Sequence, residues 1–285
     1  MSDEKVTALL VHVGADTSNL GYVGPLFDDG TFEYLPMLET YLPTKLNKKY
    51  SELSARQDHF KYGKTLADFV LERDREERVH YDPHFGEHGD LYTYAENYVE
   101  TEGRLLNLEV DDLIFFYCSL VPYSAHYYSA QVLKSTKSLI EYQRNRKNKY
   151  VIGFFTVAGI SDVTVKLRPI DIEITPKVGA KLQGDQVKKN QHYLEAIADK
   201  TFRVVRGDPD RSALLRKAVS LTARWDQKHN QFKLKGLGKD ILQSDSWYDA
   251  MRNVKKLKKK GERKLVDAIL KTNPDLKGKF TEHIK

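Results

Sequence analysis

Histidine and carboxylate side chains gather in the segment from residue 80 to residue 90. The segment contains three histidines and three acidic residues: His80, Asp82, His84, Glu87, His88 and Asp90. Such groups bind first-row metals and also act as general acids and bases. The Asp82-Pro83 pair is typical of a turn, and no helix fixes a histidine pair at i, i+4. We therefore favour a charged surface turn over a metal site and predict no metal ligands here.

A second group of polar side chains lies in the loop at residues 14–25. The loop carries three glycines and a proline, so it must turn sharply or let a backbone or ligand approach closely. Asp16, Ser18 and Asn19 could offer a carboxylate, a hydroxyl and an amide to a ligand, although such side chains also cap their own turns. A Lys-Ser or Lys-Thr pair after the last glycine is missing, which excludes a phosphate-binding P-loop.

Two further titratable residues are candidates for acid–base chemistry. Glu39 follows an apolar segment, and His192 lies in the first turn of an expected helix, where a capping role is an equal alternative. The one cysteine, Cys118, stands beside Tyr117 in an apolar segment, which favours core packing over nucleophilic chemistry. No Ser-His-Asp or Cys-His spacing can be defended.

Two apolar segments, 113–117 and 151–157, provide the framework for these residues. Each is short and rich in aromatic or β-branched residues, which predicts two buried strands, neighbours in one sheet. The polar run 141–149 between them is expected on the surface. Further patterns predict the remaining elements: strands near 6–13, 32–35, 170–174 and 202–206, and helices near 54–73, 190–199 and 209–219.

Net charge is distributed unevenly along the chain. The chain has 46 Lys and Arg against 40 Asp and Glu, and residues 251–285 hold 12 against 4, which leaves 34 against 36 for residues 1–250. The basic character therefore lies in the tail, where a helix is expected to present phosphate-binding side chains; the alternative is a solvated, charged helix end. These are Lys255, Lys256, Lys258, Lys259, Lys260, Arg263 and Lys264.

Size and composition define the broad class of the protein. A chain of 285 residues with 40% hydrophobic residues can bury a full core. The sequence shows no secretory h-region and no apolar run of about 18 residues. We therefore expect a soluble, cytoplasmic protein with no membrane partner.

Several of these blocks together resemble a known family. They are Val13 to Asn19, His80 to Phe85, Thr93-Tyr94, Asp111 to Tyr117, Tyr150 to Phe155 and Arg206 to Ser212. In this order, over roughly residues 6 to 250, they look like the third nucleotide-modification-associated domain family of phages and prokaryotes. Two of the blocks are also similar to the β-barrel of PUA-like modules of the EVE and ASCH type, which bind modified or flipped bases.

The strand and helix pattern, together with this resemblance, predicts an α+β fold. We expect a mixed, twisted, partly closed PUA-like β-barrel with surrounding helices. The expected division is a nucleotide-modification-associated domain at residues 1–250 and a basic helical C-terminal extension at 251–285. The resemblance implies a setting of modified nucleic acid and implies no reaction.

Two classes of function follow. In the first, a binding module for DNA or another nucleic acid holds a modified or extruded base, with tyrosines stacking on its ring. The residues proposed for this role are Asp16, Ser18, Asn19, Tyr22, His80, Asp82, Tyr92 and Tyr94. In the second, an enzyme acting on nucleotides or DNA uses Asp16, Glu39, Asp82 and a histidine, His80 or His192. The sequence assigns no cofactor and no oligomeric state.

Overall fold

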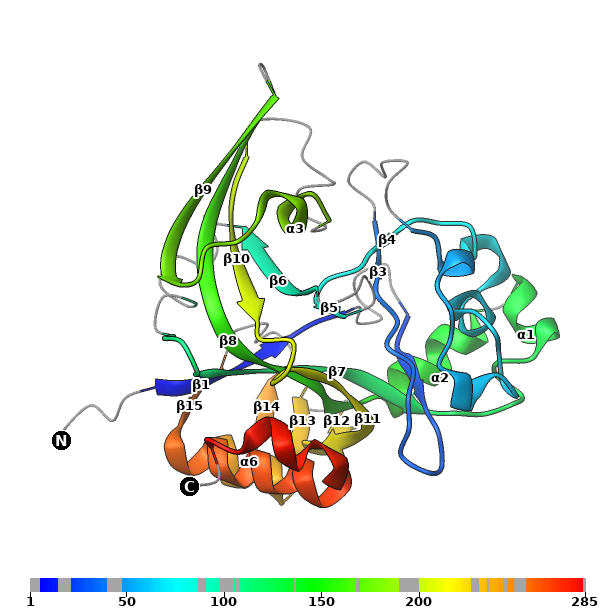
Figure 1. The fold of residues 1–285 in the computed structure, drawn as a ribbon. Helices are drawn as coiled ribbons and strands as arrows, with labels where there is room; N and C mark the ends of the chain where they lie inside the picture. The colour runs from blue at the N-terminus through cyan, green and yellow to red at the C-terminus, as the bar shows by residue number, and fades with distance from the viewer. Residues whose placement is uncertain are drawn as a thin grey trace.

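The computed structural model shows an α+β fold with one large, bent, mixed sheet and few helices (Figure 1). It describes residues 6–14, 22–39, 48–86, 91–97, 105, 108–135, 137–167, 170–189, 200–226, 231–234, 236–242, 246–248 and 255–283. The predicted fold class is therefore confirmed at this level.

Two long strands form the centre of the sheet. β7 (Leu113–Pro122) and β8 (Asn148–Leu167) pair antiparallel, with Leu113 opposite Thr156. The prediction that 113–117 and 151–157 are neighbouring strands is confirmed. The first half of β8 also pairs with β11 (Ala213–Ser220), and its second half pairs with β9 (Ile170–Gly179) and β10 (Lys200–Gly207). The strand therefore carries the chain through the bend of the sheet.

Further strands extend the sheet on both sides of this centre. β1 (Val6–His12) lies parallel to β7, and β15 (Lys255–Lys258) pairs antiparallel with β1. On the other side β6 (Tyr92–Asn97) pairs with β10, and β5 (His84–Phe85) pairs with β6. β2 (Gly24–Leu26) pairs with the end of β7. Over the described residues the order β15-β1-β7-β8-β10-β6-β5 is an open path, so closure into a PUA-like barrel is not confirmed.

Smaller elements surround the large sheet. Two minor sheets comprise β3 (Met37–Leu38) with β4 (Val79–His80), and β12 (Thr222–Asp226), β13 (Gln231–Leu234) and β14 (Ser246–Tyr248). The helices are α1 (Ala130–Ser135), α2 (Ser138–Arg146), α3 (Gly184–Lys189), α5 (Leu237–Leu242) and α6 (Lys259–Thr272). α6 lies beneath the sheet, and α1 and α2 lie beyond the end of β7 (Figure 1). No helix in the described part of the chain is long and apolar enough to cross a membrane.

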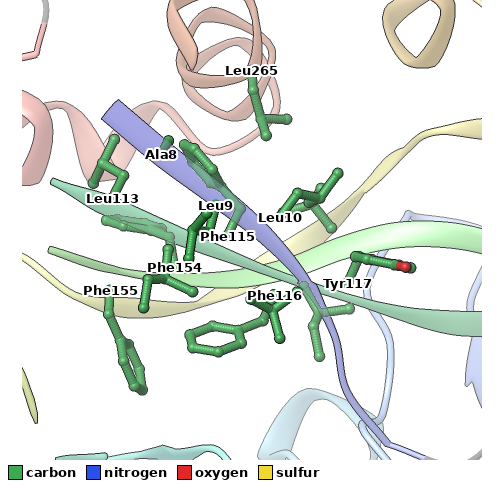
Figure 2. Close-up of a cluster of buried hydrophobic side chains, with 14 of the residues drawn as sticks. Ala8, Leu9, Leu10, Leu113, Phe115, Phe116, Tyr117, Phe154, Phe155 and Leu265 are labelled. Atoms are coloured by element: carbon green, nitrogen blue, oxygen red, sulfur yellow. The ribbon is translucent and has the colours of Figure 1, made fainter. Parts of the chain in front are cut away.

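The main core encloses both faces of β7. Phe115 and Phe116 are consecutive and both fully buried, and consecutive strand residues point to opposite faces (Figure 2). On one face Phe154 stacks on Phe280 with ring centroids 4.2 Å apart. On the other Phe116 meets Phe85 edge to face at 5.5 Å. The continuous apolar run in the sequence therefore reflects a strand covered on both sides.

The predicted helix at 54–73 is wrong. This segment forms 3₁₀ turns at Tyr50–Glu52, Gln57–His59, Leu66–Phe69 and Glu72–Asp74. The Asp68 carboxylate accepts the backbone N–H groups of Lys64 and Thr65 at 2.7 and 3.0 Å. These bonds replace the i to i+4 bonds that a continuous helix would need, because a short acidic side chain competes for the backbone donors.

The predicted helix at 209–219 is also wrong, because residues 213–220 form β11. The Asp208 side chain accepts the N–H of Asp210 at 2.9 Å and closes a tight turn instead of starting a helix. Ala213 then pairs with Phe154 in β8, so sheet pairing overrides the helical spacing. The expected strand at 32–35 is limited to isolated bridges at Thr31 and Phe32. The expected helix at 190–199 lies outside the described residues.

The polar run 141–149 is only partly on the surface, contrary to expectation. Tyr142, Gln143, Lys147 and Lys149 are buried. Gln143 accepts the N–H of Val23 at 3.2 Å and donates to its carbonyl at 3.1 Å. Burial is tolerated because these polar groups find partners.

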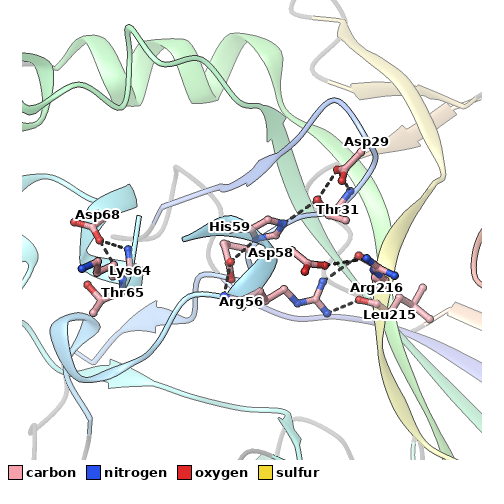
Figure 3. Close-up of polar contacts among 11 residues, drawn as sticks. Asp29, Thr31, Arg56, Asp58, His59, Lys64, Thr65, Asp68, Leu215 and Arg216 are labelled. Carbon is pink, nitrogen blue, oxygen red and sulfur yellow. Dashed lines mark hydrogen bonds and ion pairs between the residues drawn. The ribbon is translucent and has the colours of Figure 1, made fainter. Parts of the chain in front are cut away.

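A buried polar network fastens the N-terminal loops to β11 (Figure 3). His59 lies between Glu33 (Nδ1 to Oε1, 2.5 Å) and Thr31 (Nε2 to Oγ1, 2.8 Å), and all three are at most 3% exposed. Arg56 donates to the carbonyl of Leu215 in β11 at 2.6 Å. The network therefore joins segments that are about 160 residues apart in the sequence.

Candidate functional site

A cavity of about 190 Å³ lies at the carboxyl end of β1. Its lining comes from the end of β1, from β3 and β4, and from β6: His12, Val13, Gly14, Met37, His80, Asp82, Tyr94 and Ala95. The fold therefore gathers three of the residues that the sequence proposes for ligand binding, namely His80, Asp82 and Tyr94. They come from two separate strands and the turn between them.

Asp82 is held firmly in the wall of this pocket. Its side chain is buried, and Oδ2 accepts the backbone N–H of Ala95 in β6 at 3.0 Å. Its own backbone carbonyl accepts the Tyr34 hydroxyl at 3.0 Å. A carboxylate positioned in this way is a directed acceptor for a ligand's amino or imino group.

Tyr94 contributes an aromatic ring and a neutral hydroxyl. It lies on β6, packs edge to face on Phe116 at 5.3 Å and donates its hydroxyl to Glu96 Oε1 at 2.5 Å. Burial, with the nearby Glu96 and Asp82 carboxylates adding to it, raises the pKa of Tyr94 well above its usual value of 10. Tyr94 therefore remains protonated at neutral pH and cannot serve as a general base.

His80 and Glu39 form a carboxylate–imidazole pair beside the cavity. Pairing of β3 with β4 sets Met37 opposite His80, and this brings Glu39 Oε2 to 3.4 Å from His80 Nδ1. Glu39 is buried, and His80 is partly exposed. A carboxylate that orients an imidazole is the arrangement used for general acid–base chemistry.

His12 and Lys149 meet at the end of β1, and no role was predicted for either residue from the sequence. Lys149 is 2% exposed, and its Nζ lies 2.9 Å from Ser119 Oγ and 3.3 Å from His12 Nε2. The available signal was the position of Lys149 immediately before the mostly apolar stretch 150–157. A lysine there must enter the sheet, where it needs polar partners.

The other proposed ligand residues do not line this cavity or lie beyond the described chain. Tyr22 is buried in a second apolar cluster and donates its hydroxyl to Asp74. Burial, reinforced by that carboxylate, raises its pKa. Tyr92 packs edge to face on Phe155 at 5.7 Å. Asp16, Ser18, Asn19 and His192 lie outside the described residues.

The basic tail is a strand and a helix packed on the sheet. Of the seven predicted phosphate-binding side chains, Lys259 pairs with Glu262 at 2.7 Å and Lys264 with Asp240 at 3.3 Å. Lys255 is half-buried, and burial lowers its pKa. The exposed members are Lys256, Lys258, Lys260 and Arg263. Part of the positive charge of the tail is therefore balanced within the protein.

Metal-binding groups do not cluster in the described part of the chain. No set of three or more His, Cys, Asp or Glu side chains there could hold a metal ion. Cys118 is buried, and burial raises the pKa of its thiol, so it is a core residue and not a reactive thiolate.

Comparison with known proteins identifies the relationship of the chain. The family model of nucleotide modification associated domain 3 matches residues 7–266, which include the pocket-lining residues, the β7–β8 centre and half of α6. No curated protein matches the chain. No solved structure matches it either. The resemblance inferred from the sequence blocks is thus confirmed, and the chain belongs to the nucleotide modification associated domain 3 family.

Proposed function

We propose that the chain is a nucleic-acid-binding module that holds one modified, extruded base in the pocket at the end of β1. Family membership supports a role in nucleotide or DNA modification. The observation that carries the proposal is the meeting of His80, Asp82 and Tyr94 around one cavity. Proteins that read or modify a base inside a duplex commonly rotate it out of the stack into such a pocket.

The size of the pocket favours a base over a whole nucleotide. Pockets for drug-sized ligands are roughly 300–1,000 Å³, and this one is about 190 Å³. A single ring system suits that volume, and the sugar and phosphate then stay outside. Asp82 accepts from the base edge, and Tyr94 offers an aromatic wall. The role does not require the sheet to close into a PUA-like barrel.

The lysines of β15 are proposed to contact the nucleic-acid backbone. Lys255 lies opposite Leu10 in the β1–β15 pairing, two residues before His12 of the pocket. At about 3.3 Å per strand residue, this places Lys255 about 7 Å along the strand from His12. Lys256 and Lys258 are exposed and pair with Leu9 and Val6, so they lie farther from the pocket along the strand.

The test compares base preference in the wild type and in Asp82→Asn. Fluorescence anisotropy would measure affinities for an unmodified duplex and for duplexes carrying 5-methylcytosine, 5-hydroxymethylcytosine or N6-methyladenine. We expect the wild type to prefer one modified duplex and Asp82→Asn to lose that preference, a change of roughly 5- to 150-fold, corresponding to about 1–3 kcal/mol. Asp171→Asn, an exposed carboxylate on β9, is the matched control. Equal wild-type affinity for all four duplexes contradicts the proposal.

The Glu39–His80 pair supports a second candidate function, an enzyme acting on nucleotides or DNA. The carboxylate orients the imidazole for proton transfer at the pocket. Incubating the same duplexes with and without divalent metal, then analysing strands and released bases, would detect turnover. Turnover that disappears in both Glu39→Gln and His80→Gln would favour the enzyme over the binding module.

A further inference from the structure

The two helices beyond the end of β7 carry a concentration of positive charge separate from the tail. Residues 130–146, which comprise α1, α2 and the short link between them, hold four Lys or Arg residues and one acid, Glu141. We call the four the α1–α2 basic surface: Lys134, Lys137, Arg144 and Arg146. All four are exposed.

This surface differs from the tail in how its charge is balanced. Within the described chain, none of the four cations forms an ion pair with an acidic side chain, whereas Lys259 and Lys264 of the tail do. A group of cations without an internal counter-ion attracts polyanions.

Apolar packing anchors the segment that presents the four cations. Leu133 of α1 and Leu139 of α2 are buried, and the four cations themselves are exposed. The Arg146 guanidinium lies 5.0 Å from the centre of the Tyr142 ring, and Tyr142 stacks on Tyr127 at 4.0 Å. The Tyr142 hydroxyl donates to the Pro122 carbonyl at 2.5 Å, which ties this stack to the end of β7.

We propose that the α1–α2 basic surface binds the sugar–phosphate backbone of a nucleic acid. The inference rests on the proposed function and adds a second set of phosphate contacts to it. His12 of the pocket pairs with Tyr117 in β7, and β7 ends five residues later at Pro122, about 17 Å further along the strand. This is about half of the 34–36 Å helical turn of a DNA duplex. We therefore expect one duplex to contact both the pocket and the α1–α2 basic surface.

The test is a salt titration of two charge-matched variants of the full chain. The first combines Lys134→Glu, Lys137→Glu and Arg144→Glu. The control combines Lys166→Glu, Lys181→Glu and Lys188→Glu, three exposed lysines on β8, α3 and the segment before it. Each variant changes the formal net charge by −6, from +6 to 0. Affinity for an unmodified duplex and for the preferred modified duplex is measured at several salt concentrations.

We expect the α1–α2 variant to bind both duplexes more weakly than the control does. Its plot of log affinity against log salt should be less steep than that of the wild type by about 2.7, since each phosphate contact contributes about 0.9. Equal losses of affinity in the two variants would show that net charge alone causes the effect and would overturn the proposal. A slope of log affinity against log salt that is unchanged in the α1–α2 variant would also overturn it. Circular dichroism of both variants confirms that they are folded.

The failure of this proposal is distinguishable from that of the base-binding function. A wild type without preference among bases, but with the expected slope change, rejects only the base pocket. Retained preference with an unchanged slope rejects only the α1–α2 basic surface. Co-sedimentation with phosphatidylserine vesicles tests the alternative ligand, an anionic membrane surface. If the α1–α2 variant lost vesicle binding but kept DNA binding, this surface would be assigned to a membrane and the proposal overturned.

Discussion

Gly14 shows how one residue shapes the pocket. Its φ angle is +75°, a region that favours glycine, and a Cβ atom there would lie 2.7 Å from the Tyr34 ring. Tyr34 in turn donates its hydroxyl to the backbone carbonyl of Asp82. The positions of Gly14 and Asp82 therefore both depend on the Tyr34 side chain. The close approach expected of the glycine-containing loop is therefore real at Gly14.

We expect Gly14→Ala to destabilise the protein by about 1–3 kcal/mol, because the substitution adds backbone strain and a steric clash. Urea unfolding would measure the loss. Gly184→Ala is the control, because a Cβ atom at that position meets nothing within 4 Å. A Gly14→Ala protein as stable as the Gly184→Ala protein would show that the loop accommodates a side chain.

At the scale of elements, the network around His59 connects the hairpin loop at Asp29 with β11. Thr31 donates its hydroxyl and its N–H to Asp29 Oδ1 at 2.5 and 3.0 Å. His59 Nε2 lies 2.8 Å from Thr31 Oγ1, and His59 Nδ1 lies 2.5 Å from Glu33 Oε1. The His59 ring is therefore fixed between two buried polar side chains, Thr31 and Glu33.

The contribution of the Asp29 carboxylate to the stability of this network depends on pH. The two Thr31 hydrogen bonds, with smaller contributions from Lys217 and His59, hold the pKa of Asp29 below its usual value of 3.8. A carboxyl group whose pKa is lower in the folded than in the unfolded protein stabilises the fold at pH values above its unfolded-state pKa. This stabilisation is lost as the pH falls through the folded-state pKa.

We therefore expect the wild type to be more stable than Asp29→Asn above about pH 5, by less than about 1 kcal/mol because Asp29 is exposed. The difference should shrink as the pH falls below about 4. Urea unfolding of both proteins between pH 3 and pH 7 would measure it. A difference that grows on acidification would contradict the assignment.

At the scale of the whole molecule, the basic tail is part of the main core. Leu257, Leu265, Val266, Ile269 and Phe280 are at most 2% exposed and belong to the cluster that contains Phe115. Deleting residues 251–285 would expose that cluster, so the deletion is expected to unfold the protein. Charge substitutions are the appropriate test of the tail's role in binding.

We expect Phe280→Ala to cost about 3–5 kcal/mol, because Phe280 is fully buried and stacks on Phe154. Thermal and urea unfolding would measure the loss, with the exposed Lys277→Ala as control. A cost for Phe280→Ala as small as that of the control would show that the C-terminal segment does not stabilise the core.

The sequence by itself determined the centre of the fold and the family. Runs such as 113–117 and 151–157 have one stable arrangement, a strand buried on both faces, so local pattern was sufficient there. The ordered blocks around Asp82 and Tyr94 were likewise enough for the family. The helical spacing of apolar residues was misleading in two segments. At 54–73 the Asp68 side chain takes backbone N–H groups that a helix would need. At 209–219 the Asp208 side chain closes a turn, and the following residues pair with β8.

Only the tertiary structure decided which polar residues meet. His12 is far in the sequence from His80 and Tyr94, and the three residues converge because the ends of β1 and β4 and the middle of β6 line one cavity. The burial of Lys149 beside Ser119 and the pairing of Lys264 with Asp240 of α5 likewise depend on neighbours that are distant in the sequence. A sequence specifies the groups available for chemistry, but distances between them follow from strand pairing and packing, which are set by the whole chain.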